Sequence, residues 1–384
     1  MVKAGMMDIA STVNGFCTER FSGLKTALAQ SLRAGDGRTP QTVAVVIDGE
    51  PVAHLWGGYR DLARTAPWQK DTLVCMMSVG KAIAAITCLT LVDDGKLELD
   101  QPVARYWPEF AQGGKDAITV RQLLAHQSLV FSADAAPLAS GFDWDTVIKA
   151  LEVQEPLKQD GVVGSYHSFT YGYLVGELVR RITGTDVGSY LRGKLEPLFD
   201  GTYAFGLTPA EQKKCADLPY EMKSALLDGM LDREKILARC WDPLPVGTLD
   251  FNGPRLRGSV LPSLNGHGTT LWVASLFSSL ASGDEKVLSR GLVKEAATPH
   301  WEGDDIMLEF PNKMGLGLML PTEVVTFNGS ASAFGHAGVT GAFSFADPDQ
   351  KLGFSWAPGY FSEEGLEDPS LKRLIDTTNE ALAQ

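Results

Sequence analysis

The feature that most constrains the fold of this chain is an apolar run at residues 82–92, Ala-Ile-Ala-Ala-Ile-Thr-Cys-Leu-Thr-Leu-Val, which contains no charged residue. Helical spacing puts apolar side chains on every face of such a segment, which is typical of a helix buried in a core. The chain is long enough to surround it, because 384 residues with 44% hydrophobic content can form one large domain or two closely packed ones.

A serine and a lysine stand at the start of this predicted helix, with Ser78 one helical turn before Lys81. Residues at i and i+3 share a helix face, so the Lys81 amine is predicted to reach the Ser78 hydroxyl. Burial lowers the pKa of a lysine, and an uncharged amine can take the proton of a serine near pH 7. The helix N-terminus favours negative charge developing on Ser78. Taken alone, the pattern also fits a capping serine beside a solvated lysine.

A tyrosine in a polar loop offers a third reactive group. Tyr166 lies in the run Ser-Tyr-His-Ser-Phe-Thr, just before an apolar segment that is predicted to be helical. A phenol at this place can relay a proton, and a nearby ammonium favours its charged form, so Tyr166 and Lys81 are expected to share a proton. The alternative is a buried tyrosine whose hydroxyl bonds a backbone group.

The run Gly335-His336-Ala337-Gly338-Val339 has the composition of a glycine-flanked strand edge, which a substrate can approach closely. The backbone N–H groups of Val339 and Ser78 are therefore predicted to form an oxyanion hole.

The remaining pattern predicts an α+β fold, an α/β sandwich. A hairpin is expected around Asp48-Gly49, a dipeptide that favours tight turns. We expect strands from both ends of the chain to form one antiparallel sheet flanked by helices. Residues 1–75 and 270–384 would form this lobe, residues 76–269 a mainly helical second lobe with cleft-lining loops, and the active site would lie between them. The predicted helices are 8–34, 143–153, 171–197, about 208–238, 269–298 and 366–383, and the further strands are 42–47, 52–56, 315–320, 323–328, 341–346 and 351–357.

Composition excludes several classes of function. A net charge of −13 opposes binding to nucleic acid or to anionic membrane surfaces. No segment reaches 18 uninterrupted apolar residues and the N-terminus has no apolar signal core, so we expect a cytoplasmic protein without a membrane partner. Five widely spaced cysteines and six histidines without metal-ligand spacing predict no disulfide framework, metal or other cofactor. Association into a homo-oligomer stays open.

In this order and spacing, the three motifs resemble the serine β-lactamase-like superfamily, which includes penicillin-binding proteins, class C β-lactamases and family VIII carboxylesterases. The runs at residues 55–61, 123–128, 265–268 and 334–338 look most like the esterase branch. The resemblance implies Ser78 as nucleophile, Lys81 as its base and Tyr166 as the Y-x-N tyrosine. It places His336 at the start of the K-T-G-like element. The expected substrate-binding residues are His336, Ala337, Gly338, Ser168 and Trp356.

Two departures from the family pattern bear on the substrate. Ser168 stands where Y-x-N usually ends in Asn, and His336 stands where K-T-G usually begins with Lys. A lysine offers a fixed positive charge to a substrate carboxylate, whereas histidine is mostly neutral at pH 7. Recognition of β-lactam or peptide carboxylates is therefore expected to be weak.

These observations favour a serine hydrolase or acyltransferase that forms an acyl-Ser78 intermediate, foremost a carboxylesterase for small to medium acyl esters. The partner would be a small-molecule ester or amide. An acyltransferase, an amidase or peptidase, and a weak β-lactamase using the same residues remain alternatives, as does a non-catalytic binding protein that kept the fold. For His126 and His267, we favour structural roles over catalytic ones.

Overall fold

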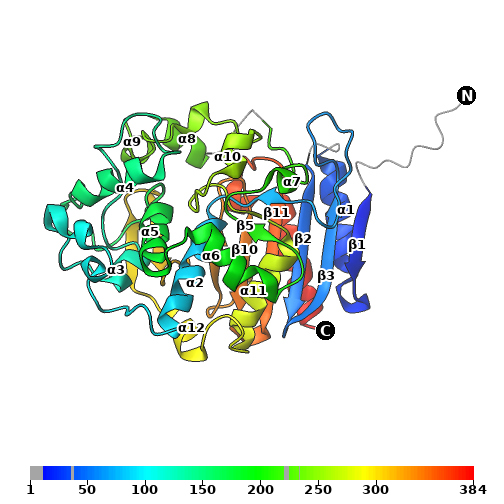
Figure 1. Ribbon diagram of the computed structural model, residues 1–384. Helices are drawn as coiled ribbons and strands as arrows, with labels where there is room; N and C mark the ends of the chain where they lie inside the picture. Colours follow the sequence, from blue (N-terminus) through cyan, green and yellow to red (C-terminus); the bar gives the residue numbers. More distant parts are fainter. Residues whose placement is uncertain (1–11, 36–38, 220–224, 233) are drawn as a thin grey trace, which may run out of the picture.

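The computed structural model describes residues 12–35, 39–219, 225–232 and 234–384. Its largest sheet is antiparallel and has the strand order β1-β3-β2-β11-β10-β9. The N-terminal strand β2 pairs with the C-terminal strand β11, from Ile47 opposite Leu352 to Gln41 opposite Pro358. The predicted union of both chain ends in one sheet is confirmed (Figure 1). The strands are β1 (Val13–Cys17), β2 (Gln41–Ile47), β3 (Glu50–Gly57), β9 (Phe334–Ala337), β10 (Phe343–Asp347) and β11 (Leu352–Pro358).

The predicted hairpin joins β2 to β3. Asp48 and Gly49 both have positive φ angles, of 50° and 82°, and these angles let the chain reverse within a tight turn.

Helices cover both faces of the sheet, and the alternation of side chains along β2 shows which helix covers which face. Ala44 and Val46 pack against α11 (Thr270–Ser282), while Val43 and Val45 belong to a core shared with α1 (Gly23–Ala34) and α13 (Pro369–Leu382). The sheet is therefore the middle layer of an α/β sandwich.

The helical part of the molecule lies beside the sheet, on the left in Figure 1. Its central helix is α2 (Val79–Asp93), which is buried from Val79 to Leu91 and packs against α5, α6 and strand β9. The other helices of the structure are α3 (Val120–Leu124), α4 (Trp144–Val153), α5 (Tyr171–Thr183), α6 (Val187–Lys194), α7 (Pro209–Gln212), α8 (Ala225–Leu231), α9 (Ile236–Cys240), α10 (Pro254–Gly258) and α12 (Arg290–Ala296).

Two small sheets complete the strands. β4 (Val74–Cys75), β5 (Tyr203–Ala204) and β6 (His267–Gly268) form one, and β7 (Trp301–Asp305) pairs with β8 (Phe310–Met314) in the other. The short 3-10 helices are Glu19–Phe21, Val103–Arg105, Pro108–Gly114, Glu196–Leu198, Val246–Thr248, Pro348–Gln350 and Gly365–Glu367.

Some predicted elements were wrong in extent or type. The helix predicted at 8–34 begins only at Gly23; residues 13–17 form the edge strand β1, and residues 8–11 lie outside the described residues. The predicted helices 171–197 and 269–298 are each interrupted, because Gly184 and Gly283 end α5 and α11 with left-handed φ angles of 75° and 64°.

The strands predicted at 315–320 and 323–328 are absent from the described chain, which instead forms β7, β8 and β9 on either side of them. Gly317 has a φ of 74°, a conformation that breaks an extended run.

In the region predicted to be a helix at 208–238, only α7, α8 and the start of α9 are helical, and residues 220–224 and 233 lie outside the described residues. The division into lobes at residues 75/76 and 269/270 stays a prediction. Within the described chain, every helix is too short or too polar to cross a bilayer.

Candidate active site

Ser78 lies on the turn that leads from strand β4 into helix α2. The residue before it, Met77, has a φ of 48°, which is uncommon for a residue with a side chain and is found mostly where the surrounding structure enforces it. The Met76 N–H donates to the Gly266 carbonyl at 2.8 Å and anchors this turn to the loop before β6. The serine hydroxyl is thereby fixed at the N-terminus of the central helix.

Lys81 meets the predicted contact with this serine. Its Nζ lies 2.9 Å from Ser78 Oγ and donates to the Ser263 carbonyl oxygen at 3.0 Å. The side chain is 0% exposed, and no carboxylate among the described residues forms an ion pair with it. Burial therefore holds the pKa of Lys81 well below its ordinary value. An uncharged amine in contact with a hydroxyl can accept that hydroxyl's proton.

Tyr166 lies next to this pair. It is 4% exposed, and Lys81 Nζ is 4.9 Å from the centre of its ring. Burial raises the pKa of the phenol, against a smaller opposing effect of its bond with the Ser78 side chain. Burial opposes the charged form of both groups, and the predicted sharing of a proton between Lys81 and Tyr166 stays a prediction.

Two residues hold Tyr166 in place: Asp305, which the sequence did not single out, and His126, for which a structural role was expected. The buried carboxylate of Asp305, at the end of β7, accepts the Tyr166 N–H at 2.9 Å and the Asn312 amide at 2.9 Å, and it also accepts the Ser165 hydroxyl. The His126 ring stacks on Tyr166 with 5.3 Å between ring centres. No motif marks Asp305 in the sequence, since it acts through contacts between segments far apart in the chain.

The predicted oxyanion hole has the required backbone approach. Gly338 is packed so closely that a Cβ on it would lie 2.5 Å from the Met76 carbonyl oxygen. This contact brings the end of β9 against the turn that carries Ser78. The N–H groups of Ser78 and Val339 donate no hydrogen bond to the rest of the described chain, and both residues line one cavity. Two free donors beside a nucleophile suit a developing oxyanion.

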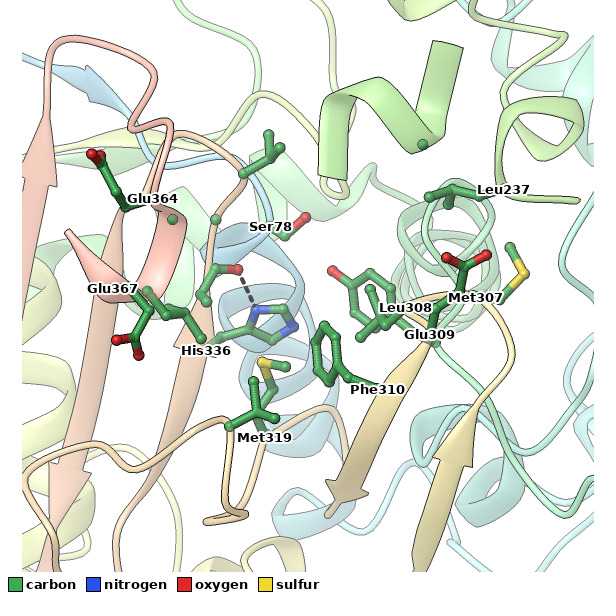
Figure 2. Close-up of a pocket in the computed structure, with 18 of the residues that line it drawn as sticks. Ser78, Leu237, Met307, Leu308, Glu309, Phe310, Met319, His336, Glu364 and Glu367 are labelled. Atoms are coloured by element: carbon green, nitrogen blue, oxygen red, sulfur yellow. Dashed lines mark hydrogen bonds between the residues drawn. The ribbon is translucent and has the colours of Figure 1, made fainter. Parts of the chain in front are cut away.

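This cavity has a volume of about 510 Å³ and opens beside Ser78 (Figure 2). Tyr166, His336, Ala337, Gly338 and Val339 line it together with Ser78. Most of its remaining wall is apolar, formed by Leu237, Met307, Leu308, Phe310, Met319, Val324 and Leu366. Its charged lining consists of Glu309, Glu363, Glu364, Glu367 and Lys235, and the lysine pairs with Glu309 at 2.6 Å.

The structure places two expected substrate-binding residues away from this cavity. Trp356 is 0% exposed, lies in the core between the sheet and α1, and donates its Nε1–H to Gln41 Oε1 at 2.9 Å. Its predicted contact with substrate is therefore corrected. Ser168 instead accepts a hydrogen bond from Trp241 Nε1 at 3.0 Å. His267 is buried and bonds the Asn265 carbonyl through Nδ1 at 2.7 Å, also outside the cavity.

The antiparallel sheet between helical layers, with a helical part beside it, is the β-lactamase/transpeptidase-like fold. A family model described as Beta-lactamase matches residues 27–368, so the chain belongs to this family of serine hydrolases. The resemblance drawn from the motifs is confirmed.

Individual relatives agree with this assignment. The chain is 26% identical to the esterase/beta-lactamase LipL of Mycobacterium tuberculosis, over 91% of this chain and 83% of LipL. A penicillin-binding protein homolog from Caulobacter crescentus, known from a crystal structure, has 33% sequence identity to this chain. The two structures superpose with a TM-score of 0.85 over 96% of this chain and 100% of the homolog. A family VIII carboxylesterase is 27% identical with a TM-score of 0.86, again over 96% and 100% of the two chains.

Proposed function

We propose that this protein is a serine carboxylesterase that forms an acyl-enzyme at Ser78 with neutral esters of small to medium acyl groups. The observation that carries the proposal is the contact of 2.9 Å between the Ser78 hydroxyl and a buried lysine amine without a counter-charge. Burying a lysine in this way destabilises the folded protein. A non-catalytic binding protein would have no use for that destabilisation, whereas a nucleophilic enzyme needs the uncharged base.

In the proposed reaction, the Ser78 oxygen attacks the ester carbonyl while Lys81 accepts the hydroxyl proton. The N–H groups of Ser78 and Val339 stabilise the negative charge on the carbonyl oxygen, a contribution of about 3 kcal/mol for each well-placed donor. The ester C–O bond then breaks, and the protonated phenol of Tyr166 gives its proton to the leaving alcohol. Lys81 then passes the proton that it took to the phenolate of Tyr166, which restores both groups, and water enters to cleave the acyl-Ser78 bond by the same steps in reverse.

The charge of the cavity supports esters over β-lactams and peptides with a free carboxylate. Four glutamates and one lysine line the cavity, and His336 occupies the position where the family motif has a cation. A substrate carboxylate would meet net negative charge there without a fixed positive partner. The name of the family VIII carboxylesterase agrees with this preference, whereas LipL is named both as an esterase and as a β-lactamase.

The proposal is tested with a panel of three chromogenic substrates: a p-nitrophenyl ester, a p-nitroanilide with the same acyl group, and nitrocefin. We expect turnover of the ester to exceed that of the other two, and labelling by a fluorophosphonate probe that is lost in Ser78→Ala. An added alcohol that diverts the acyl group to a new ester would reveal acyl transfer, which shares every step except the last. Rapid turnover of nitrocefin with little of the ester, or an unlabelled wild type, would refute the proposal.

A further inference from the structure

His336 presents a hydrogen-bond acceptor, and its tautomer follows from one contact. Nδ1 lies 2.8 Å from the Ala337 carbonyl oxygen, and a carbonyl oxygen can only accept, so the ring proton is on Nδ1. Burial, followed by the effect of Lys81, lowers the pKa of His336 to about 3, so the ring is uncharged at neutral pH. Nε2 therefore carries a lone pair and no proton.

This nitrogen has no hydrogen-bond partner among the described residues, although the side chain is only 1% exposed. Burying an acceptor without a partner destabilises a folded protein. Among the described residues, His54, His126 and His267 also have a buried ring nitrogen without a partner, but of these histidines only His336 lines the cavity beside Ser78. In Figure 2 the His336 ring points from β9 into the space between Ser78, Met319 and Phe310. The acceptor thus belongs to the cavity wall, close to the nucleophile.

The neighbours of His336 leave a substrate as its natural partner. The ring centre of Tyr166 is 5.8 Å away, and the apolar side chains of Met319 and Phe310 line the same part of the cavity without offering a donor. The carboxylates of Glu309, Glu363, Glu364 and Glu367 add negative charge to the lining. A group that binds there must donate a hydrogen bond and must not be an anion.

We propose that the site selects uncharged esters that carry a hydroxyl or N–H group in reach of His336 Nε2, and that it discriminates against isosteric esters without a donor. The inference rests on the proposed esterase function and adds a specificity-determining residue to it. Where the family motif offers a lysine donor to a substrate anion, this chain would offer an acceptor to a substrate donor.

The test compares pairs of esters that differ only by a hydroxyl in place of a methyl group. One pair varies the acyl side, p-nitrophenyl 3-hydroxybutyrate against p-nitrophenyl 3-methylbutyrate. The other varies the alcohol side, 2-hydroxypropyl acetate against 2-methylpropyl acetate. The ratio of kcat/KM within each pair is measured for the wild type, His336→Leu and His336→Gln. The ester that carries a methyl group in place of the hydroxyl is the internal control, because a general loss of activity lowers kcat/KM for both members of a pair alike.

We expect the hydroxy ester to be preferred in at least one pair by the wild type, and that preference to fall about tenfold in His336→Leu. His336→Gln keeps an acceptor oxygen and should retain part of the preference. If the wild type prefers the methyl-bearing ester in both pairs, the inference is overturned, and this result does not depend on whether a variant folds. The inference is also overturned if His336→Leu leaves the ratio of kcat/KM within the pairs unchanged. In either case, ester turnover that depends on Ser78 would leave the esterase proposal standing; absence of any such turnover would sink both.

Discussion

Replacing Lys81 by methionine separates the catalytic use of this lysine from its effect on stability. Methionine has a similar length and no charge, so it fills the space that the lysine stem occupies. Activity should be lost, because the base is gone. The folded protein should nevertheless become more stable at neutral pH, because burial without a counter-charge lowers the pKa of Lys81, and this shift destabilises the folded state at a pH where the unfolded lysine is protonated.

The magnitude follows from proton linkage. In the unfolded chain a lysine titrates near pKa 10.4, so it stays protonated from pH 7 to pH 9. If folded Lys81 is uncharged throughout that range, folding releases one proton, and the stability of the wild type rises with pH by about 1.4 kcal/mol per unit. The stability advantage of Lys81→Met should then shrink by about 2.7 kcal/mol between pH 7 and pH 9.

Urea unfolding of the wild type and the variant at pH 7, 8 and 9 measures this difference. Contributions that do not depend on pH, including the lost contact with the Ser263 carbonyl, cancel in the slope. Lys25 is exposed on α1, so Lys25→Met serves as the matched control and should give a slope near zero. A difference between wild type and Lys81→Met that stays constant across the three pH values would show that Lys81 is charged in the folded protein, and would refute the reasoning.

Three further substitutions test the other parts of the site. Tyr166→Phe should lower kcat for an ester by about 10²-fold or more with little change in KM, because the phenol is the proposed proton donor to the leaving alcohol; an unchanged kcat would exclude that role. Gly338→Ala should lower kcat by about 10²-fold or more, since its Cβ would lie 2.5 Å from the Met76 carbonyl oxygen and displace the strand edge; wild-type kinetics would contradict this. Asp305→Asn should destabilise the protein by about 1–3 kcal/mol in urea unfolding, because an amide cannot accept all of the hydrogen bonds that the carboxylate accepts; equal stability would show that the loop is held otherwise.

Local patterns account for the parts of the fold that the sequence predicts well. The contact between Ser78 and Lys81 depends only on the helical repeat, and the turn at Asp48-Gly49 depends only on the conformational preference of that dipeptide. The apolar run at 82–92 forms a buried helix because helical spacing puts apolar side chains on all of its faces. The union of strands from both ends of the chain in one sheet was expected because β-rich runs stand at both ends, although the pairing of β2 with β11 was not specified.

Errors arose where tertiary contacts decide the conformation. Strand β1 has an exposed Asn-Gly-Phe centre and gains its extended form from pairing with β3, so apolar spacing alone could not separate it from the following helix. Side chains along β11 point alternately to the two faces of the sheet, and that of Trp356 lies on the face covered by α1 and α13, away from the cavity. The sequence of β11 has no polar alternation that would distinguish the face toward α1 and α13 from the opposite face, so it could not predict the direction of this side chain.

The contacts that organise the candidate site could not be read from the sequence either. Besides Ser78, Lys81 contacts the backbone carbonyl of Ser263, and a backbone atom leaves no signature in residue type. Asp305 belongs to no motif, and its partners Tyr166 and Ser165 are distant in the chain. The free acceptor of His336 became visible only with its contact to the Ala337 carbonyl.

The most direct test of the account is the mass of the intact protein during turnover of an activated ester. Mixing with p-nitrophenyl acetate and quenching within the first turnover should give a species heavier by one acetyl group, and peptide mapping should place that group on Ser78. The adduct should be absent from Ser78→Ala and should form far more slowly in Lys81→Met. An acetyl group that maps to another residue, or one that appears equally in Ser78→Ala, would contradict the account.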